Sequence, residues 1–144
     1  VQLTESGKWC VLYGKNDATW TTNIPSSLAE KINDFHNQNY VVRSISFNDY
    51  GDWVIVSDEY YATSSTELTN WLRNGSDNWG RLWAVCVTDD AAVAVYENGF
   101  CYRGNVPEDL IEALRSTSFD VFRLKISGTS WFFADTNGNY RYKM

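Results

Sequence analysis

The feature that most constrains the fold of this chain is an internal repeat of about forty residues. Short apolar runs begin at Trp9, Trp53, Ala92 and Trp131, so their starts lie 44, 39 and 39 residues apart. Each run is followed by a turn signal, of which Asn98-Gly99 is typical. Asn-Gly favours a β-hairpin because both residues tolerate positive φ. Spacing of this regularity predicts a repeat architecture.

Each copy of the repeat continues with a second strand, a short helix and a third strand. The helix starts are marked by Pro25, Ser65 and Pro107. Proline suits the first helical turn because its missing N–H has no partner there. We expect helices near 25–36, 65–73 and 107–115. Helices this short do not persist alone, so they must pack on sheet.

The predicted fold class is α+β and strand-dominated, with about 12 short antiparallel strands in four three-stranded units joined by three short helices. The four units lie roughly at 1–23, 40–63, 81–104 and 120–144 of a single repeat domain. Neither end leaves a strand without a partner. This favours a closed arrangement, either propeller-like or barrel-like.

Composition excludes several classes of protein. A net charge of −6 and 12 scattered basic residues argue against a nucleic-acid surface. No apolar run approaches the roughly 20 residues of a membrane-spanning helix. Cys10, Cys86 and Cys101 allow either one disulfide with a free thiol or three buried thiols. With a start at Val1 that is compatible with leader removal, we expect a secreted protein.

Catalytic signatures are mostly absent from the sequence. The single histidine, His36, has no nucleophile motif with it, and there is no CxxC, HxxxH or glycine-rich phosphate motif. Neighbouring carboxylates such as Asp89 and Asp90 lie in predicted turns, where acidic residues are common for conformational reasons. We therefore expect a protein that is not an enzyme and needs no cofactor or metal.

Aromatic residues make up 16% of the chain and indicate a strand-rich core. Trp20, Tyr60 and Tyr102 recur at equivalent second-strand positions. Their parity with Ile24 and Val106, which should face the core, predicts that all three rings are buried.

Candidate ligand contacts lie in turns, where the copies differ. Tyr50 stands beside Asp49 and Asp52, in a stretch that a hairpin explains better than an incomplete calcium loop. In the polar segment 74–80, Trp79 and Asn78 either cover the neighbouring helix or contact a ligand. The predicted ligand-binding residues are Trp79, Tyr50, Asp49, Asp52, Asn78 and Asn98.

A flat aromatic ring can stack on a sugar, and neighbouring amides and carboxylates can form hydrogen bonds with its hydroxyls. The leading hypothesis is therefore a non-enzymatic, lectin-like protein with repeat-derived sites for carbohydrate or glycoprotein. The alternative is a protein-interaction domain, either an inhibitor or an assembly subunit, for which an oligomer is possible. A scaffold around a small-molecule pocket is a third hypothesis.

Overall fold

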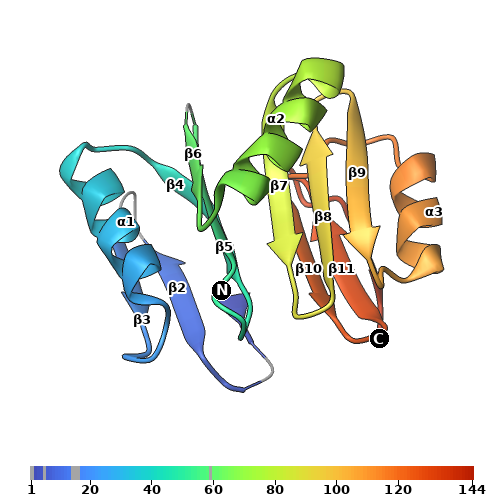
Figure 1. The fold of residues 1–144 in the computed structure, drawn as a ribbon. Coiled ribbons are helices and arrows are strands. Elements are labelled where there is room, and N and C mark those ends of the chain that lie inside the picture. The colour runs from blue at the N-terminus through green and yellow to red at the C-terminus, as the bar shows by residue number, and fades with distance from the viewer. Residues whose placement is uncertain (1, 5, 14–16, 59) are drawn as a thin grey trace. The chain divides into compact units, whose positions relative to one another are not determined.

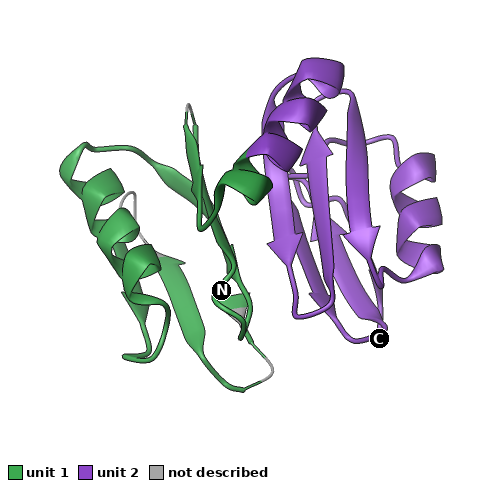
Figure 2. Ribbon diagram, in the orientation of Figure 1, with its two compact units in different colours: residues 1–69 green, residues 70–144 purple. Residues whose placement is uncertain are grey.

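The computed structural model describes residues 2–4, 6–13, 17–58 and 60–144. The chain divides into two compact units, residues 1–69 and 70–144 (Figure 2). The predicted turn at 14–16 lies outside the described residues.

Unit 1 contains two small sheets and the helix that joins them in sequence (Figure 1). Its elements are β1 (Gln2–Leu3), β2 (Trp9–Tyr13), β3 (Asp17–Trp20), α1 (Ser26–Asn37), β4 (Val42–Phe47), β5 (Trp53–Ser57) and β6 (Tyr61–Thr63).

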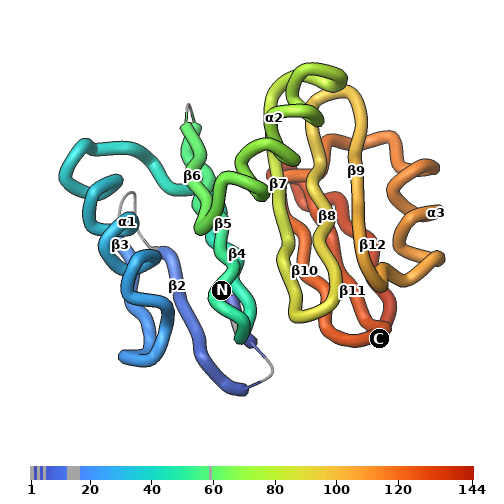
Figure 3. Tube along the Cα trace, viewed as in Figure 1, coloured from blue at the N-terminus to red at the C-terminus, as the bar shows by residue number. Residues whose placement is uncertain are grey.

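Unit 2 repeats this order after helix α2, which begins in residues of unit 1. Its elements are α2 (Thr66–Trp79), β7 (Leu82–Val87), β8 (Ala91–Tyr96), β9 (Gly99–Gly104), α3 (Glu108–Ser116), β10 (Arg123–Ser127), β11 (Ser130–Ala134) and β12 (Tyr140–Lys143). Figure 3 follows the same path along the Cα trace.

The strands form four three-stranded antiparallel sheets with the orders β1-β2-β3, β4-β5-β6, β7-β8-β9 and β10-β11-β12, here called the first to fourth sheets. This confirms the predicted strand-dominated fold with three helices. Among the described strands no sheet closes on itself. The single domain and the closed arrangement stay predictions.

Each unit has its own hydrophobic core, in which one helix packs with residues of two sheets. In unit 1 the buried face of α1, with Leu28, Ile32 and Phe35, joins residues of the first two sheets. In unit 2 the corresponding face of α3, with Leu110 and Leu114, joins residues of the third and fourth sheets. Burial of these apolar faces stabilises helices that are too short to form alone.

An equivalent hydrogen bond in each unit explains why the tryptophan and the helix start recur together. The indole N–H of Trp53 donates to Ser27 Oγ at 2.9 Å, and that of Trp131 donates to Asp109 Oδ1 at 3.0 Å. Each acceptor lies two residues after the proline that precedes α1 or α3. A nearly buried indole needs such a partner, so the paired motif is a requirement of the fold.

Helix α2 is longer than the sequence predicts, and the proposed polar loop at 74–80 is wrong. The helix continues through Asn74 and Gly75 to Trp79, and Gly80 follows at φ +87°. Glycine is a poor helix former, but Gly75 is buried against the ring of Tyr96, whose hydroxyl donates to Leu72 O at 2.9 Å. Tertiary packing therefore overrides local propensity.

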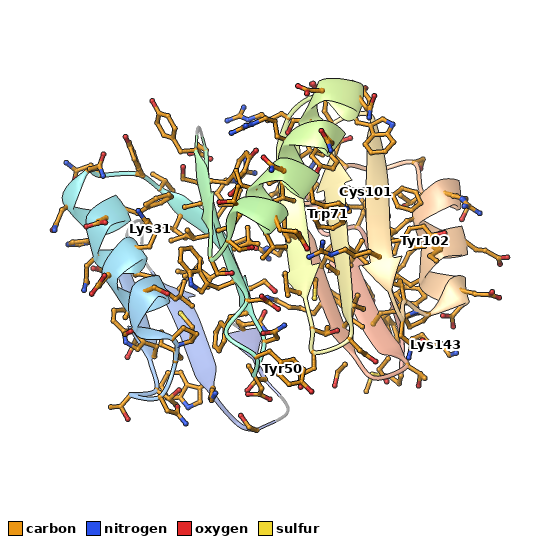
Figure 4. All side chains as sticks on the ribbon, viewed as in Figure 1. Lys31, Tyr50, Trp71, Cys101, Tyr102 and Lys143 are labelled. Atoms are coloured by element: carbon orange, nitrogen blue, oxygen red, sulfur yellow. The ribbon has the colours of Figure 1, made fainter. Side chains whose placement is uncertain are left out.

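The three cysteines are free thiols. Cys10 and Cys86 are buried in the cores, and Cys101 is half-buried on β9 (Figure 4). The sequence left open one disulfide or none, and the structure shows none. Among the described residues, no helix has the length and apolarity needed to cross a bilayer.

Candidate binding face

The fourth sheet has two faces of opposite character. Residues directly opposite in an antiparallel pair point to the same face, and successive residues alternate. On one face Leu124 is opposite Phe133, which is opposite Arg141. This inner face adds Phe133 and Leu124 to the core of unit 2.

Strand β12 is fastened to α3 by the two cations on its inner face. Arg141 Nη1 donates to Ala113 O at 3.0 Å and to Ser116 Oγ at 2.9 Å, near the C-terminus of the helix. Lys143 Nζ lies 2.6 Å from an oxygen of Asp109, near its N-terminus. The bond from Lys143, followed by that from the Trp131 indole, lowers the pKa of Asp109. Both ends of β12 are thus held in place.

The outer face of the same sheet carries three exposed aromatic rings. Phe132, Tyr140 and Tyr142 are 39%, 60% and 58% exposed. The ring centroids of Phe132 and Tyr140 are 6.3 Å apart, and those of Tyr140 and Tyr142 are 6.1 Å apart, with planes inclined by only 24–25°. These separations lie within the range of offset-stacked aromatic pairs, and each ring keeps a solvent-exposed part. We call these three residues the aromatic ladder.

The central strands of the second and third sheets use the corresponding face differently. Val54 and Val56 occupy the matching positions of β5 and are 1% and 3% exposed. In the third sheet, Ala92 and Ala94 lie on the same face as Tyr96, which contacts α2. On these two central strands the positions that match Phe132 and Ala134 are therefore small and buried, whereas Phe132 is large and exposed. Tyr140 corresponds by register to Tyr61 of β6 and Cys101 of β9, and Tyr142 corresponds to Thr63 and Arg103.

Two cations share the outer face with the aromatic ladder. Lys125 is directly opposite Phe132, and Arg123 is opposite Ala134, which is opposite Tyr140. Arg123 is exposed and Lys125 half-buried. The outer face therefore combines flat apolar rings with positive charge.

The predicted site residues around Tyr50 lie together in the β4–β5 hairpin of unit 1. Asp52 Oδ2 accepts the Asn48 amide at 3.0 Å. Asp49 accepts hydrogen bonds from the hydroxyl and the N–H of Ser6, and the hydroxyl bond is the first cause of the lowered pKa of Asp49. Tyr50 points outward at 77% exposure (Figure 4). Asp52 stabilises the hairpin loop, and Asp49 ties this loop to the connection between β1 and β2. A ligand role for these residues stays a prediction.

The other predicted site residues lie together in unit 2. Trp79 is half-buried, with its ring against Gly99 and 5.9 Å from that of Tyr96, and its carbonyl accepts the Asn98 N–H at 3.0 Å. Asn78 is exposed and donates to Asn74 O at 3.1 Å. The contacts of Trp79 fasten the end of α2 to the β8–β9 turn. Ligand contacts by this group also stay a prediction.

The prediction that the second-strand aromatics are buried is wrong for two of the three rings. Tyr60 and Tyr102 are exposed, and Trp20 is half-buried against the core of unit 1. Gly104, at φ +76°, separates Tyr102 from Val106, so strand alternation does not continue across it. Tyr60 precedes β6 and lies outside the ladder.

Sequence reasoning did not single out the aromatic ladder, although a signal was present. The run Tyr140-Arg141-Tyr142-Lys143 alternates aromatic with cationic residues, which assigns the rings to one face and the cations to the other. Among the described residues, no three His, Cys, Asp or Glu side chains gather as metal ligands.

Comparison of the chain with protein-family models, with curated proteins and with solved structures gave no match.

Proposed function

We propose that the protein is a non-enzymatic, lectin-like carbohydrate-binding protein whose glycan site is the outer face of the fourth sheet. The observation that carries the proposal is the aromatic ladder, three exposed and nearly parallel rings on one face of the fourth sheet. The ligand would lie flat on the rings of Phe132, Tyr140 and Tyr142.

The chemistry of the rings supports a sugar ligand. An aromatic face carries negative charge density and attracts the weakly positive C–H groups on one side of a sugar ring. The hydroxyls of Tyr140 and Tyr142 can also exchange hydrogen bonds with sugar hydroxyls. An extended row of rings offers a surface to several sugars of one chain, so weak contacts add up.

The rigidity of the face supports the same proposal. Arg141 and Lys143 hold β12 against α3 from the inner side. Rings that are positioned before the ligand arrives lose less conformational entropy on binding. The face is therefore preorganised.

A glycan array followed by calorimetry on the intact protein tests the proposal. Tyr142→Ala should weaken binding to the selected glycan about tenfold, since loss of one stacking ring costs about 1–1.5 kcal/mol. Tyr102→Ala, an exposed ring on β9 of the same unit, is the matched control and should bind normally. Equal affinity of both variants would place the site elsewhere.

Variants of the turn residues decide between the ladder and the sites predicted from sequence. If Tyr50→Ala or Trp79→Ala abolishes glycan binding while Tyr142→Ala does not, the turns are the site. Failure of the protein to bind any glycan on the array refutes the carbohydrate proposal in every form.

A protein partner is the second candidate function, and one observation favours it. In the third sheet, the face that corresponds to the ladder is covered by α2, through contacts such as Tyr96 with Leu72. A helix from another protein could cover the fourth sheet in the same way. Light scattering would then show an oligomer or complex that Tyr142→Ala dissociates, with no glycan required.

The closed arrangement of the four units is a separate proposal, supported by their shared strand order. Small-angle X-ray scattering tests it. A compact chain of this length has a radius of gyration of about 15 Å. A clearly larger value would contradict closure.

A further inference from the structure

We infer that the ladder's ligand is an acidic glycan, one whose sugars carry carboxylates, and that Arg123 and Lys125 read this charge. The inference rests on the proposed function, because it concerns the same face. It adds the chemical class of the sugar.

The strands of the fourth sheet are positively charged, although the chain as a whole is negatively charged. The protein has 18 acidic and 12 basic residues, with a net charge of −6. The strands β10, β11 and β12 contain four of those basic residues and none of the acidic ones. Arg141 and Lys143 lie on the inner face and contact α3. The other two cations, Arg123 and Lys125, face outward with the rings.

The strand register places these cations beside the rings. Lys125, Phe132 and Tyr142 form one row across the sheet, and Arg123, Ala134 and Tyr140 form the next. Each row thus has a cation on β10 and a tyrosine on β12. A sugar chain lying over the rings would present its substituents to both cations.

Arginine gives the inference its chemical specificity. Its planar guanidinium matches the geometry of a carboxylate and can donate two parallel hydrogen bonds to it. The small side chain of Ala134 separates Arg123 from Tyr140 in their row. A uronate whose ring stacks on tyrosine would therefore meet a cation on the β10 side.

The charge pattern favours an acidic glycan over a single-stranded nucleic acid, which also stacks on rings. Nucleic acid carries a charge at every nucleotide, and its binding needs a long track of cations. Here only two cations of the fourth sheet point outward, on a protein of net charge −6. Such a surface fits a few carboxylates better than a continuous polyanion.

The test compares polygalacturonate with its fully methyl-esterified form, which has the same backbone without the charge. Oligomers of matched length are titrated into the intact protein by calorimetry at low and high salt, with oligo(dT) as a third ligand. We expect at least tenfold tighter binding of the acidic form, and this preference should shrink with salt.

Variants assign the preference to named residues. Arg123→Gln with Lys125→Gln should remove most of it, roughly tenfold, while binding of the esterified form stays unchanged. Lys31→Gln, which removes one cation from α1 in unit 1, is a control for loss of positive charge elsewhere and should keep the full preference (Figure 4). Retention of the preference in the double variant would overturn the inference.

The outcomes separate the two proposals. Equal binding of both oligomers, lost in Tyr142→Ala, overturns the acidic-glycan inference and leaves the proposed function standing. Binding of oligo(dT) alone overturns both and makes the face a nucleic-acid site. Binding of none of these ligands, nor of an alginate oligomer, also overturns the inference, and the glycan array then decides the proposed function.

Discussion

Replacement of Gly75 by alanine should destabilise the protein, although alanine is the better helix former. In an open helix this change stabilises by about 1 kcal/mol. Here a Cβ on residue 75 would lie closer than 3.0 Å to ring atoms of Tyr96, including its hydroxyl oxygen. Either α2 or the ring must then move.

The magnitude follows from three effects. Overpacking of a buried site costs about 1–3 kcal/mol. Displacement of the ring also weakens the hydrogen bond from Tyr96 to Leu72 O, which is worth about 1 kcal/mol. Against the helix-propensity gain of about 1 kcal/mol, the net loss for Gly75→Ala should be about 2 kcal/mol.

Urea unfolding followed by circular dichroism measures this loss. Asn74→Ala, an exposed change in the same helix turn, is the control and should be neutral or slightly stabilising. In a Tyr96→Leu background the obstructing ring atoms are gone, so Gly75→Ala should become stabilising. A Gly75→Ala protein at least as stable as the original would show that α2 does not pack on Tyr96 as described.

Three further changes test other parts of the fold. Ser27→Ala leaves the indole N–H of Trp53 without its acceptor and should lower the unfolding free energy by about 1 kcal/mol. Asp135→Asn should keep the β11–β12 turn but reduce the loss of thermal stability on acidification, because the Asn139 amide lowers the pKa of Asp135 in the folded state. Arg141→Ala should speed hydrogen exchange of the β12 amides and weaken glycan binding, although the ladder itself is intact.

Each of these changes has a control and a contradicting result. Ser26→Ala, at an exposed neighbouring serine, should be neutral. An equal loss of unfolding free energy in Ser26→Ala would show that the hydrogen bond of the Trp53 indole does not cause the loss. A carboxylate whose pKa is lowered in the folded state stabilises the protein at pH values above its unfolded-state pKa of about 4. This stabilisation is lost as the pH falls below that value and through the folded-state pKa. Unchanged acid sensitivity in Asp135→Asn would contradict that contribution. Unaltered exchange in Arg141→Ala would show that α3 does not hold β12.

The repeat could be predicted from sequence because its signals are local. Trp53 and Trp131 lie at or next to the start of equivalent central strands, and Pro25 and Pro107 precede the helices that hold their indoles. Apolar alternation and turn chemistry report on neighbours in the chain, so the strands of all four sheets were found.

The C-terminal half of α2 could not be predicted, because its cause is tertiary. Asn74-Gly75-Ser76 favours a loop by propensity, and only the ring of Tyr96, 21 residues later, explains a helical glycine there. The prediction that Tyr102 is buried failed for a related reason, because Gly104 interrupts the strand alternation on which that prediction rested.

The candidate binding face could be predicted from the sequence only in part. Alternation in Tyr140 to Lys143 could have assigned the tyrosines to one face. It could not show that this face is open, because the same pattern would also fit a face beneath another helix. Exposure depends on what packs above the sheet, and the four residues of β12 carry no information about that.

The central claim is that the outer face of the fourth sheet binds glycan, and an NMR titration tests it most directly. Spectra of the intact, isotope-labelled protein would be followed during addition of a polygalacturonate oligomer. We predict the largest shift changes at the rings of Phe132, Tyr140 and Tyr142 and at Arg123 and Lys125. Shift changes confined to the residues around Tyr50 or Trp79, with the fourth sheet unaltered, would contradict the account.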